Sequence, residues 1–559
     1  MENAPWTDCT DFESTMYPSL VSLEHFANRP DDRPFFVCEY AHSMGNSPGN
    51  LKEYWELIYR YPKLFGACVW EWQNHGLRAF TEDGKQFWAG GNDYGMPFEL
   101  HGANGNFCND GLLSSDKVPH PAMTELKKVY QPLHASLISE NPLIIKLTAH
   151  DSFVPGMLLG RWELVSGNKV LSSGDLDLAG LQPLSEKELS IPVDLPDAEA
   201  FLNLSFTLRE SANFAPAGFL MASDQFVLNE GKTAVSQPSV NTGAALTSVR
   251  EGQLYRIIGE DFTLEFDLLH GELSGYTTGG QELLVSPLRP NFWHAPTDND
   301  ISFGHGICEK WLGRGIDRLV SRLTEDPVIL GDDETLITWD SHAVVRQSFG
   351  QITLRFQKRW GANPTATVAD TDEYWTVYAD GTIDIKTTFS ERAFPRAEKE
   401  DFWWPRLGMT LAIPASFNTV KWHGRGPGEN YVDRAYASDI GWYESKVTDL
   451  HTSYARMQAN GTRIDTRSLL VSDFRGSGLR FSALESPFSF TVHDYTDQAL
   501  TKAWHEYELE RGSLTVIDID LAETGIGSNS CGPIPLDQYK LYLRDQERVL
   551  RFRIEPVRR

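Results

Sequence analysis

A glutamate at the end of an apolar run is the residue in this sequence best placed to do chemistry. The segment reads Cys38-Glu-Tyr-Ala-His-Ser-Met-Gly-Asn-Ser47, and Glu39 closes the run that begins at Pro34. A carboxylate at a strand end could act as a nucleophile or as a general base. The structural alternative is a carboxylate paired with a neighbour. His42 alone could equally be a structural histidine, and Trp70 alone a core residue, so the function depends on what surrounds them.

Residues 33–72 must position this glutamate, and their pattern predicts a β-α-β unit. The runs Pro34–Glu39 and Phe65–Trp70 are short and apolar, as is typical of parallel strands buried on both faces. Between them, Ser47-Pro48 predicts the start of a helix that continues to Tyr61. One such unit fits a (β/α)8 barrel or a doubly wound sheet. At the C-terminal rim of a barrel, residues at strand ends tend to be catalytic.

The rest of the sequence has the residue pattern of β-strands. Period-two alternation with turn signals predicts an immunoglobulin-like β-sandwich over 134–232 and one large antiparallel β-sandwich domain over 247–559. Small polar residues over 233–246 predict a linker, and Asp380-Gly381 predicts a hairpin turn. Two strand–helix units cannot close a barrel of about 250 residues. We therefore interpret 1–133 as the C-terminal end of a barrel that begins outside this sequence.

Charge and cysteine content argue against several functions. Lys and Arg number 50 against 77 Asp and Glu, a net charge of −27, whereas nucleic acids and anionic membrane surfaces require a basic footprint. No run approaches the roughly 20 apolar residues of a membrane span, and the first residues lack signal-peptide features. Six cysteines without a CxxC pair argue against a zinc knuckle and suit a reducing compartment, so we expect a cytoplasmic protein.

An ordered series of motifs resembles the large lac-type β-galactosidases of glycoside hydrolase family two. Chance could supply one short motif, but not a series in the right order along nearly the whole chain. The resemblance implies the C-terminal end of a TIM barrel, then an immunoglobulin-like sandwich, then the family's large C-terminal β domain. The matching segments are 38–47, Phe65-Gly-Ala-Cys-Val-Trp-Glu-Trp-Gln73, Phe107-Cys-Asn-Asp-Gly-Leu-Leu113, Pro119-His-Pro-Ala-Met-Thr-Glu125, Arg289-Pro-Asn-Phe-Trp-His-Ala-Pro-Thr-Asp-Asn-Asp300, Gly424-Arg-Gly-Pro-Gly-Glu-Asn-Tyr-Val-Asp-Arg434 and Gly525-Ile-Gly-Ser-Asn-Ser-Cys-Gly-Pro533.

The resemblance implies retaining hydrolysis of terminal β-galactosides such as lactose. Glu39 matches the family's nucleophile, which forms a covalent galactosyl-enzyme. A second carboxyl group about 5–5.5 Å away protonates the leaving oxygen and later activates water. Tyr17 matches a tyrosine that hydrogen-bonds the nucleophile. His42 matches a residue near the galactose hydroxyls, and Trp70 matches the aromatic floor under the sugar.

The resemblance also implies two metal ions. Phe107, through its backbone carbonyl, and Asp110 match the family's Na⁺ ligands; the common type has Asn in place of Asp110, but an anionic ligand still suits a hard cation. The main Mg²⁺ ligands match an earlier part of the barrel, outside this sequence. Cys531 falls where some members place a tryptophan that stacks on the aglycone and others carry Cys. No role is assigned to 457–461, where Ala459 replaces an acidic residue.

The family's general acid/base is a Glu in an Asn-Glu motif of an earlier barrel strand. The single Asn-Glu pair here, Asn229-Glu230, ends a strand of the sandwich and does not match it. We therefore expect the chain to be inactive alone and to form a homo-oligomer in full-length form. Two alternatives remain open: a non-catalytic partner subunit that completes an enzyme in trans, and a carbohydrate-binding β protein.

Overall fold

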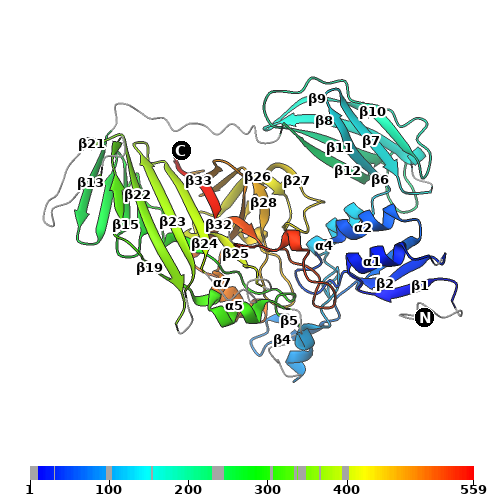
Figure 1. Cartoon of the computed structure of the whole chain (residues 1–559), viewed down its shortest axis with the longest axis horizontal. Helices are drawn as coiled ribbons and strands as arrows, with labels where there is room; N and C mark the ends of the chain where they lie inside the picture. The colour runs from blue at the N-terminus through cyan, green and yellow to red at the C-terminus, as the bar shows by residue number, and fades with distance from the viewer. Residues whose placement is uncertain are drawn as a thin grey trace.

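β-Strands dominate the computed structural model, and helices are few (Figure 1). No helix within the described part of the chain is long and apolar enough to cross a membrane. The residues that the structure describes are 10–30, 32–95, 103–152, 155–229, 245–302, 306–332, 336–337, 348–363, 367–392, 402–544 and 546–558.

The N-terminal unit is a parallel sheet with two helices packed on one face (blue in Figure 1). It contains β1 (Glu13–Met16), β2 (Phe35–Tyr40) and β3 (Leu64–Val69), with α1 (Leu20–Ala27) and α2 (Leu51–Arg60). Strands β2 and β3 pair in parallel, which confirms the predicted β-α-β unit. Strand β1 is a further parallel neighbour of β2. The sequence analysis missed it because Glu-Ser-Thr-Met contains no apolar run.

The prediction that α2 starts at Ser47-Pro48 is wrong. Asn50 is the N-cap, with φ of 64°, and the helix begins at Leu51. Instead of capping the helix, the Ser47 hydroxyl accepts a 2.6 Å hydrogen bond from Asn299 Nδ2. A tertiary contact therefore displaces the local capping interaction that the sequence suggested.

Beyond β3 the chain forms a hairpin and short helices that contact the large β domain. Glu125 in α4 accepts hydrogen bonds from the backbone N–H groups of Tyr436 (3.1 Å) and Ala437 (2.9 Å), which fix this helix to that domain. The elements are β4 (Leu77–Phe80), β5 (Gln86–Ala89), η1 (Gly91–Tyr94), α3 (Ala103–Asn106) and α4 (Pro121–Val129).

Two antiparallel sheets follow as a sandwich (cyan in Figure 1), with strand orders β10-β7-β6 and β12-β11-β8-β9 among the described residues. Leu143, Ile145 and Leu147 of β7 alternate into the shared core, as period-two patterning predicts. The strands are β6 (Leu133–Glu140), β7 (Leu143–Ala149), β8 (Leu158–Ser166), β9 (Lys169–Leu176), β10 (Glu186–Ser190), β11 (Ala200–Leu208) and β12 (Leu220–Leu228).

The large β domain contains two further antiparallel sheets around one hydrophobic core. The linker predicted over 233–246 falls mostly outside the described residues, and β13 begins at Leu246. The first sheet runs β21 (Ser348–Phe349), β13 (Leu246–Glu251), β14 (Leu254–Ile258), β15 (Phe262–Asp267), β16 (Glu272–Thr278), β18 (Ser286–Asn291), β25 (Arg406–Pro414), β32 (Leu514–Glu523), β31 (Phe488–His493) and β28 (Arg463–Thr466), with β17 (Gln281–Glu282) beside β16.

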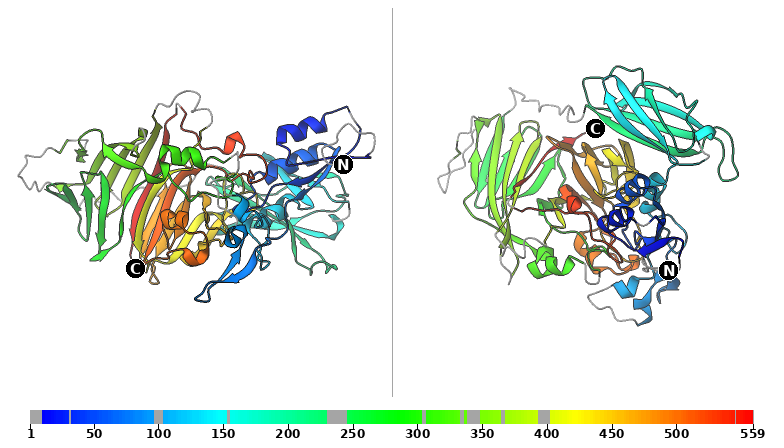
Figure 2. Two further views of the ribbon diagram at one scale, coloured as in Figure 1. Left: turned by 90° about the horizontal axis from the view of Figure 1, so that it is seen from below. Right: turned by 45° about the vertical axis from the view of Figure 1, so that its right-hand side comes forward.

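The second sheet contains the predicted hairpin, which is confirmed: β23 and β24 pair antiparallel around Asp380-Gly381, with Gly381 at φ of 90°. Figure 2 shows this domain from two further sides, with the short helices α5 (Cys308–Arg314) and α7 (Asp497–Lys502). The sheet runs β19 (Val320–Leu323), β22 (Gln351–Gly361), β23 (Thr367–Tyr378), β24 (Ile383–Glu391), β33 (Arg548–Val557), β30 (Gly478–Ala483), β29 (Ser468–Ser472), β26 (Thr419–Gly426) and β27 (Asp439–Lys446), with β20 (Val328–Leu330) beside β22.

Two buried histidines make the large domain sensitive to acid. Burial lowers the pKa of His493 to about 3, and burial with the nearby Arg467 charge lowers that of His423 to about 4. An unfolded histidine binds its proton near pH 6.5. The unfolded chain therefore binds more protons below about pH 6.5, and stability falls as the pH drops toward these folded-state values. We expect the urea midpoint to decrease between about pH 7.5 and pH 5, and His493→Gln to weaken that dependence.

The matched control for this prediction is His270, an exposed histidine whose pKa is raised by its hydrogen bond to Asp267. Because the folded state binds this proton more tightly than the unfolded state does, protonation of His270 stabilises the fold. His270→Gln should therefore not weaken the loss of stability at low pH. Equal pH dependence in the His493→Gln variant and the parent chain would contradict the assignment.

Candidate functional site

The C-terminal ends of the three parallel strands bring together three of the residues selected from the sequence. Tyr17 directly follows β1, Glu39 is the penultimate residue of β2, and Trp70 directly follows β3. Backbone hydrogen bonds join these ends: the Tyr17 N–H donates to the Glu39 carbonyl (2.8 Å) and the Trp70 N–H to the Tyr40 carbonyl (3.0 Å). Parallel strands end at one edge of their sheet, so their terminal side chains share one rim.

The Tyr17 side chain lies within interaction range of the Glu39 carboxylate at this rim. Burial raises the pKa of Tyr17 well above its ordinary value, and the nearby Cys531, Glu39 and Asp110 groups raise it further. The Tyr17 hydroxyl therefore keeps its proton and can donate it to the half-buried carboxylate. Cys531, also half-buried, lies beside Tyr17, and burial raises the pKa of its thiol. The nucleophile candidate thus has an oriented donor beside it.

His42 and Trp70 converge on Asp110. Trp70 Nε1 donates to Asp110 Oδ2 (3.0 Å), and His42 Nε2 lies 3.3 Å from the same oxygen. His42 is 1% exposed, and its ring packs 5.0 Å from that of Phe107. Burial acts to raise the pKa of Asp110, but the interactions with His42, Glu71 and Trp70 outweigh it and hold this pKa below its usual range. Asp110 is therefore an ionised anchor for both rings.

Glu71 belongs to this site, although the sequence analysis did not identify it. Burial, followed by the neighbouring Asp110 carboxyl, raises the pKa of Glu71 to about 7. The Glu71 N–H also donates to the Asp110 carbonyl (2.9 Å). Its position directly after Trp70, at a strand end, was the sequence feature that could have revealed it.

The surroundings of Asp110 fit a hard cation. Asp110 Oδ1 is buried and has no hydrogen-bond partner among the residues described, and Glu71 adds a second carboxyl. Phe107, whose carbonyl the sequence analysis selected, lies close by and is 38% exposed. Oxygen-only donor sets of this kind suit Na⁺, Mg²⁺ or Ca²⁺ rather than thiolate- or imidazole-binding metals. Within the described ranges, no group of three or more His, Cys, Asp or Glu side chains could hold a metal.

A loop of the large β domain, residues 525–533, completes the rim. Ser530 Oγ lies 2.8 Å from His42 Nδ1. Asn299 holds the loop on one side, since its Nδ2 donates to the Ile526 carbonyl (2.6 Å) and its Oδ1 accepts from the Ser530 N–H (2.8 Å). Asp433 holds the other side, accepting from the N–H groups of Ile526 (3.0 Å) and Gly527 (2.8 Å). Three motifs far apart in sequence therefore meet here.

Segment 457–461, to which no role was assigned, supports the loop that follows β2. Gln458 Oε1 accepts from the N–H groups of Asn46 (3.0 Å) and Asp298 (3.1 Å), and the Ala459 carbonyl accepts from Asn46 Nδ2 (2.9 Å). These contacts place the segment behind the site. The loss of the acidic residue at 459 does not affect them, because Ala459 contributes its backbone.

Removal of the Asp433 carboxylate should loosen the 525–533 loop. It leaves two buried N–H groups without acceptors, which destabilises by about 1–3 kcal/mol each. In Asp433→Ala we expect amide hydrogen exchange over 525–533 to accelerate by about tenfold or more, because 1.4 kcal/mol is a factor of ten. The exposed Asp537→Ala is the control, since Asp537 contacts Tyr542 and Lys540 outside this loop. Unchanged exchange over 525–533 in a folded Asp433→Ala chain would refute this positioning role.

All seven residues selected from the sequence thus lie at one rim, and comparisons with known proteins cover the same segments. Residues 258–554 match the family profile described as "Beta galactosidase small chain". Residues 4–135 match "Glycosyl hydrolases family 2, TIM barrel domain", and residues 157–229 match "Beta-galactosidase, domain 4".

Curated relatives are similar along almost the whole chain. A "Beta-galactosidase" of Actinobacillus pleuropneumoniae is 30% identical over 537 residues, which cover 95% of this chain and 49% of that protein. One of Priestia megaterium is 29% identical over 547 residues, covering 93% and 48%. The chain therefore spans about half the length of the curated relatives it matches. Among solved structures, a galactose 1-epimerase from Lactobacillus acidophilus aligns with a TM-score of 0.29 and 9% identity, covering 55% of this chain and 96% of that one.

Proposed function

Because this chain belongs to the β-galactosidase family within glycosyl hydrolases family 2, we propose that its rim serves the retaining hydrolysis of terminal β-D-galactosides such as lactose. The observation that carries the proposal is the meeting of Tyr17 and Glu39 at the shared strand ends, where the Tyr17 N–H donates to the Glu39 carbonyl (2.8 Å), beside the His42–Asp110–Trp70 cluster. A carboxylate beside a neutral hydroxyl, next to an aromatic ring and buried polar groups, is suited to attack a bound sugar.

In the proposed mechanism, Glu39 attacks the anomeric carbon as the bond to the leaving oxygen breaks. A second carboxylic acid protonates that oxygen, and galactose remains bound to Glu39 as an ester. The second group, now a carboxylate, then deprotonates a water molecule that attacks the anomeric carbon. Galactose leaves with its original anomeric configuration, and Glu39 is regenerated. Tyr17 orients the Glu39 oxygens through both steps.

The other rim residues have positions that suit substrate binding. Trp70 is 38% exposed, so its ring can support the apolar face of a sugar, and its N–H is fixed by Asp110. His42 is held in one orientation between Asp110 and Ser530, and we propose that it lies near the hydroxyl groups of bound galactose. For Cys531, which lies beside Tyr17, we propose a position near the leaving group or acceptor.

Two cations enter the proposal as expectations. Na⁺ would be held by Asp110 and the Phe107 carbonyl, where it would balance negative charge and orient substrate hydroxyls. For Mg²⁺, we propose that its main ligands lie in family segments outside this sequence, as does the acid/base glutamate.

Full-length homo-oligomerisation and cytoplasmic location are also proposed. The cytoplasmic location is supported by the sparse cysteine content, six in 559 residues with no CxxC pair, which suits a reducing compartment.

An uncovered sheet face supports the proposal that further strands complete the site. Helices α1 and α2 cover one face of the β1–β3 sheet. On the other side, Phe12 is 48% and Phe65 is 53% exposed, and their rings form an edge-to-face pair with centroids 5.8 Å apart. Exposed aromatic residues beside unpaired strand edges indicate a surface that binds additional strands. Those strands could come from the same polypeptide or from a partner subunit in trans.

The test measures galactose release from an aryl β-galactoside by this chain alone. The same assay is then run after mixing with the part of the Actinobacillus pleuropneumoniae relative that this chain does not match. We expect activity only in the mixture, with an aryl β-glucoside cleaved far more slowly. Activity of the chain alone would overturn the view that its acid/base lies elsewhere. A mixture that assembles but cleaves no β-galactoside would overturn the proposed reaction.

A further inference from the structure

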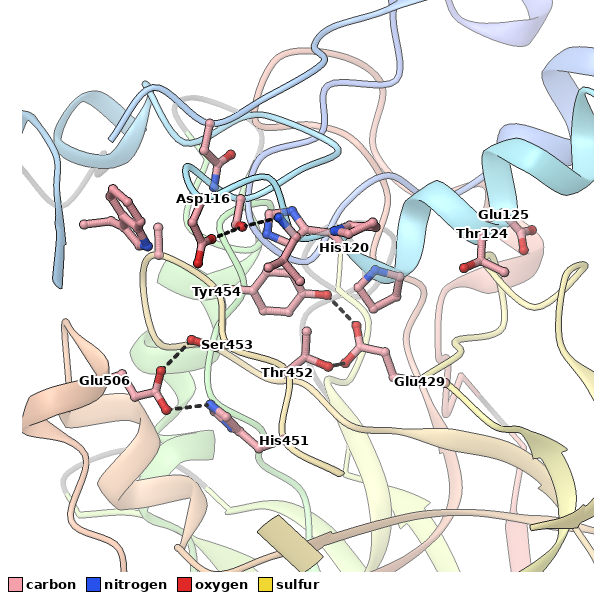
Figure 3. A pocket seen from close by; sticks show the side chains of 18 of the residues that line it. Asp116, His120, Thr124, Glu125, Glu429, His451, Thr452, Ser453, Tyr454 and Glu506 are labelled. Carbon is pink, nitrogen blue, oxygen red and sulfur yellow. Dashed lines mark hydrogen bonds and ion pairs between the residues drawn. The ribbon is translucent and has the colours of Figure 1, made fainter. Parts of the chain in front are cut away.

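A cavity lies apart from the rim, where the β4–β5 hairpin and the segment that leads into α4 face the large β domain (Figure 3). It has a volume of about 730 Å³ and is lined by β5, by residues 114–125 and by residues 426–455 and 505–506. Small-molecule sites typically enclose about 300–1,000 Å³. None of the seven rim residues lines this cavity, so it is independent of the reaction proposed above.

Two buried side chains that line the cavity carry polar atoms without partners among the described residues. Arg434 is 2% exposed; its Nη2 donates to Asn46 Oδ1 (2.6 Å) and Glu429 Oε1 (2.7 Å), while Nε and Nη1 have no acceptor. His120 is 5% exposed, and its Nδ1 lies 2.9 Å from the Gly111 carbonyl. Because a carbonyl only accepts, the proton is on Nδ1, which leaves Nε2 as an unpartnered acceptor.

The unpartnered polar atoms of Arg434 and His120 indicate which chemical groups a ligand of this cavity would carry. The guanidinium of Arg434 needs an acceptor, whereas the neutral ring of His120 needs a donor; burial lowers the pKa of His120 and keeps it neutral. A hydroxyl group can accept and donate at once. An anion can satisfy only Arg434 and would meet the carboxylates of Asp116 and Glu506, which also line the cavity. An ammonium group can satisfy only His120.

The walls suit a polyhydroxylated ring. Phe87 and Trp88 of β5 contribute aromatic surface, and the Arg78 guanidinium covers the Trp88 ring at 5.5 Å from its centroid. Flat apolar sugar faces pack well on such rings. Figure 3 shows Ser453 and Glu506 facing one another in the wall, joined by a 2.5 Å hydrogen bond. A hydroxyl and a carboxylate therefore line the same cavity as the two aromatic rings.

A buried carboxylate in this wall, Glu429, is not free to react. Glu429 accepts from Arg434, from Tyr454, from the Thr452 hydroxyl (2.9 Å) and from the Gly461 N–H (2.7 Å). With both oxygens occupied, it fixes the wall and does not attack a ligand. We propose that this cavity is a second carbohydrate-binding site, which holds a neutral mono- or disaccharide without cleaving it.

Occupation of the cavity should also tighten the contact between the two parts of the chain. Arg434 and Tyr454 of the large domain both hydrogen-bond Asn46 Oδ1, in the loop after β2. A sugar bound to Arg434 and His120 adds a bridge across the same boundary. Ligands that bind only the folded state raise its stability, so sugars should raise the Tm of the chain.

The test is calorimetric titration of the full chain with galactose, glucose and lactose, with Tm measured in parallel. We expect saturable binding below about 100 mM. His120→Asn keeps a donor for Gly111 but removes the Nε2 acceptor, and Trp88→Ala removes the aromatic wall. Each should weaken this binding by about tenfold, a loss of about 1.4 kcal/mol, while Trp88→Phe restores most of it. Trp70→Ala, at the rim, should leave it unchanged, which separates this site from the proposed catalytic one.

Several results would overturn the proposal. One is the absence of saturable sugar binding, and another is binding that Trp88→Ala and His120→Asn both leave unchanged. Displacement of the sugar by millimolar sulfate would identify an anion site instead. Loss of the binding on mixing with the unmatched part of the Actinobacillus pleuropneumoniae relative would show that polypeptide fills the cavity. Circular dichroism of each variant establishes that its fold is retained.

Discussion

Glu39→Gln abolishes galactoside hydrolysis by the completed site, with an expected loss in kcat of about 10³-fold or more. Glutamine has nearly the same shape but cannot form the ester with the anomeric carbon. The amide can still accept a hydrogen bond from Tyr17, so the rim should keep its geometry and substrate should still bind. The measurement is kcat and KM for an aryl β-galactoside in the mixture described above, with KM changing much less than kcat.

Glu56→Gln is the matched control for this substitution. Glu56 lies on α2 of the same β-α-β unit, and its side chain is 54% exposed with only a 3.7 Å contact to Lys52. Its substitution should leave kcat unchanged. A 2-fluoro galactoside with a good leaving group should label the parent at Glu39 and leave the Glu39→Gln chain unlabelled. Labelling of a different carboxylate would show that Glu39 is not the nucleophile.

Arg406→Met severely destabilises the large β domain at neutral pH. Arg406 is 2% exposed and lies among four buried or nearly buried carboxylates: Glu523 (2.6 Å), Asp497 (3.0 Å), Asp518 (3.3 Å) and Asp520 (3.4 Å). Loss of one partner from a buried ion pair typically destabilises by about 3–5 kcal/mol, and here several carboxylates lose a cation that they share. The free energy of unfolding from urea titration measures the effect.

The pH dependence of this destabilisation has a definite sign. Burial raises the pKa of Asp520 well above its ordinary value and that of Asp497 to about 7, and Arg406 opposes both increases. Without Arg406 these groups take up protons more readily, and protonation removes the unpaired charge. The difference in stability between the variant and the parent should therefore shrink from about pH 8 to pH 5. A difference independent of pH would mean that lost packing, not lost charge, dominates.

Arg355→Met provides the comparison for Arg406. Arg355 also makes two hydrogen bonds to a carboxylate, Asp372, at 2.9 and 2.8 Å across β22 and β23. Both side chains are about a third exposed, so water replaces the lost interaction and the effect should stay below about 1 kcal/mol. Equal effects at 355 and 406 would contradict the role assigned to burial.

Local patterning explains why most strands and the central site residues could be predicted from sequence. Strands β2 and β3 have continuous apolar runs, which are typical of strands buried on both faces. Strand β7 alternates apolar and polar residues, which is typical of a strand buried on one face. Glu39 could be selected because it ends one of the apolar runs. Strand β1 could not be found in this way, because its four residues carry no periodic pattern. The start of α2 was misplaced because Ser47 bonds to Asn299, a residue 252 positions away.

The parts of the site that the sequence did not reveal depend on tertiary contacts. Asn299, Asp433 and Gln458 act by hydrogen-bonding backbone groups of distant loops, and neither periodicity nor composition records such contacts. The resemblance to a family identified the motifs that contain these residues, but it did not show which backbone groups their side chains contact. The involvement of Glu71 likewise emerges only from its proximity to Asp110, which comes from a separate loop.

The contact between His42 and Ser530 joins residues 488 positions apart. During synthesis, the strand ends that carry Glu39 leave the ribosome hundreds of residues before the loop that completes their rim. Translation at about 5–20 residues per second separates the two events by tens of seconds. An immature chain consequently presents the strand end that carries Glu39 before Ser530 and Cys531 are available. The His42–Ser530 contact and the remaining contacts of the 525–533 loop can form only after residue 530 has been synthesised, so the rim is among the last parts of the chain to be completed.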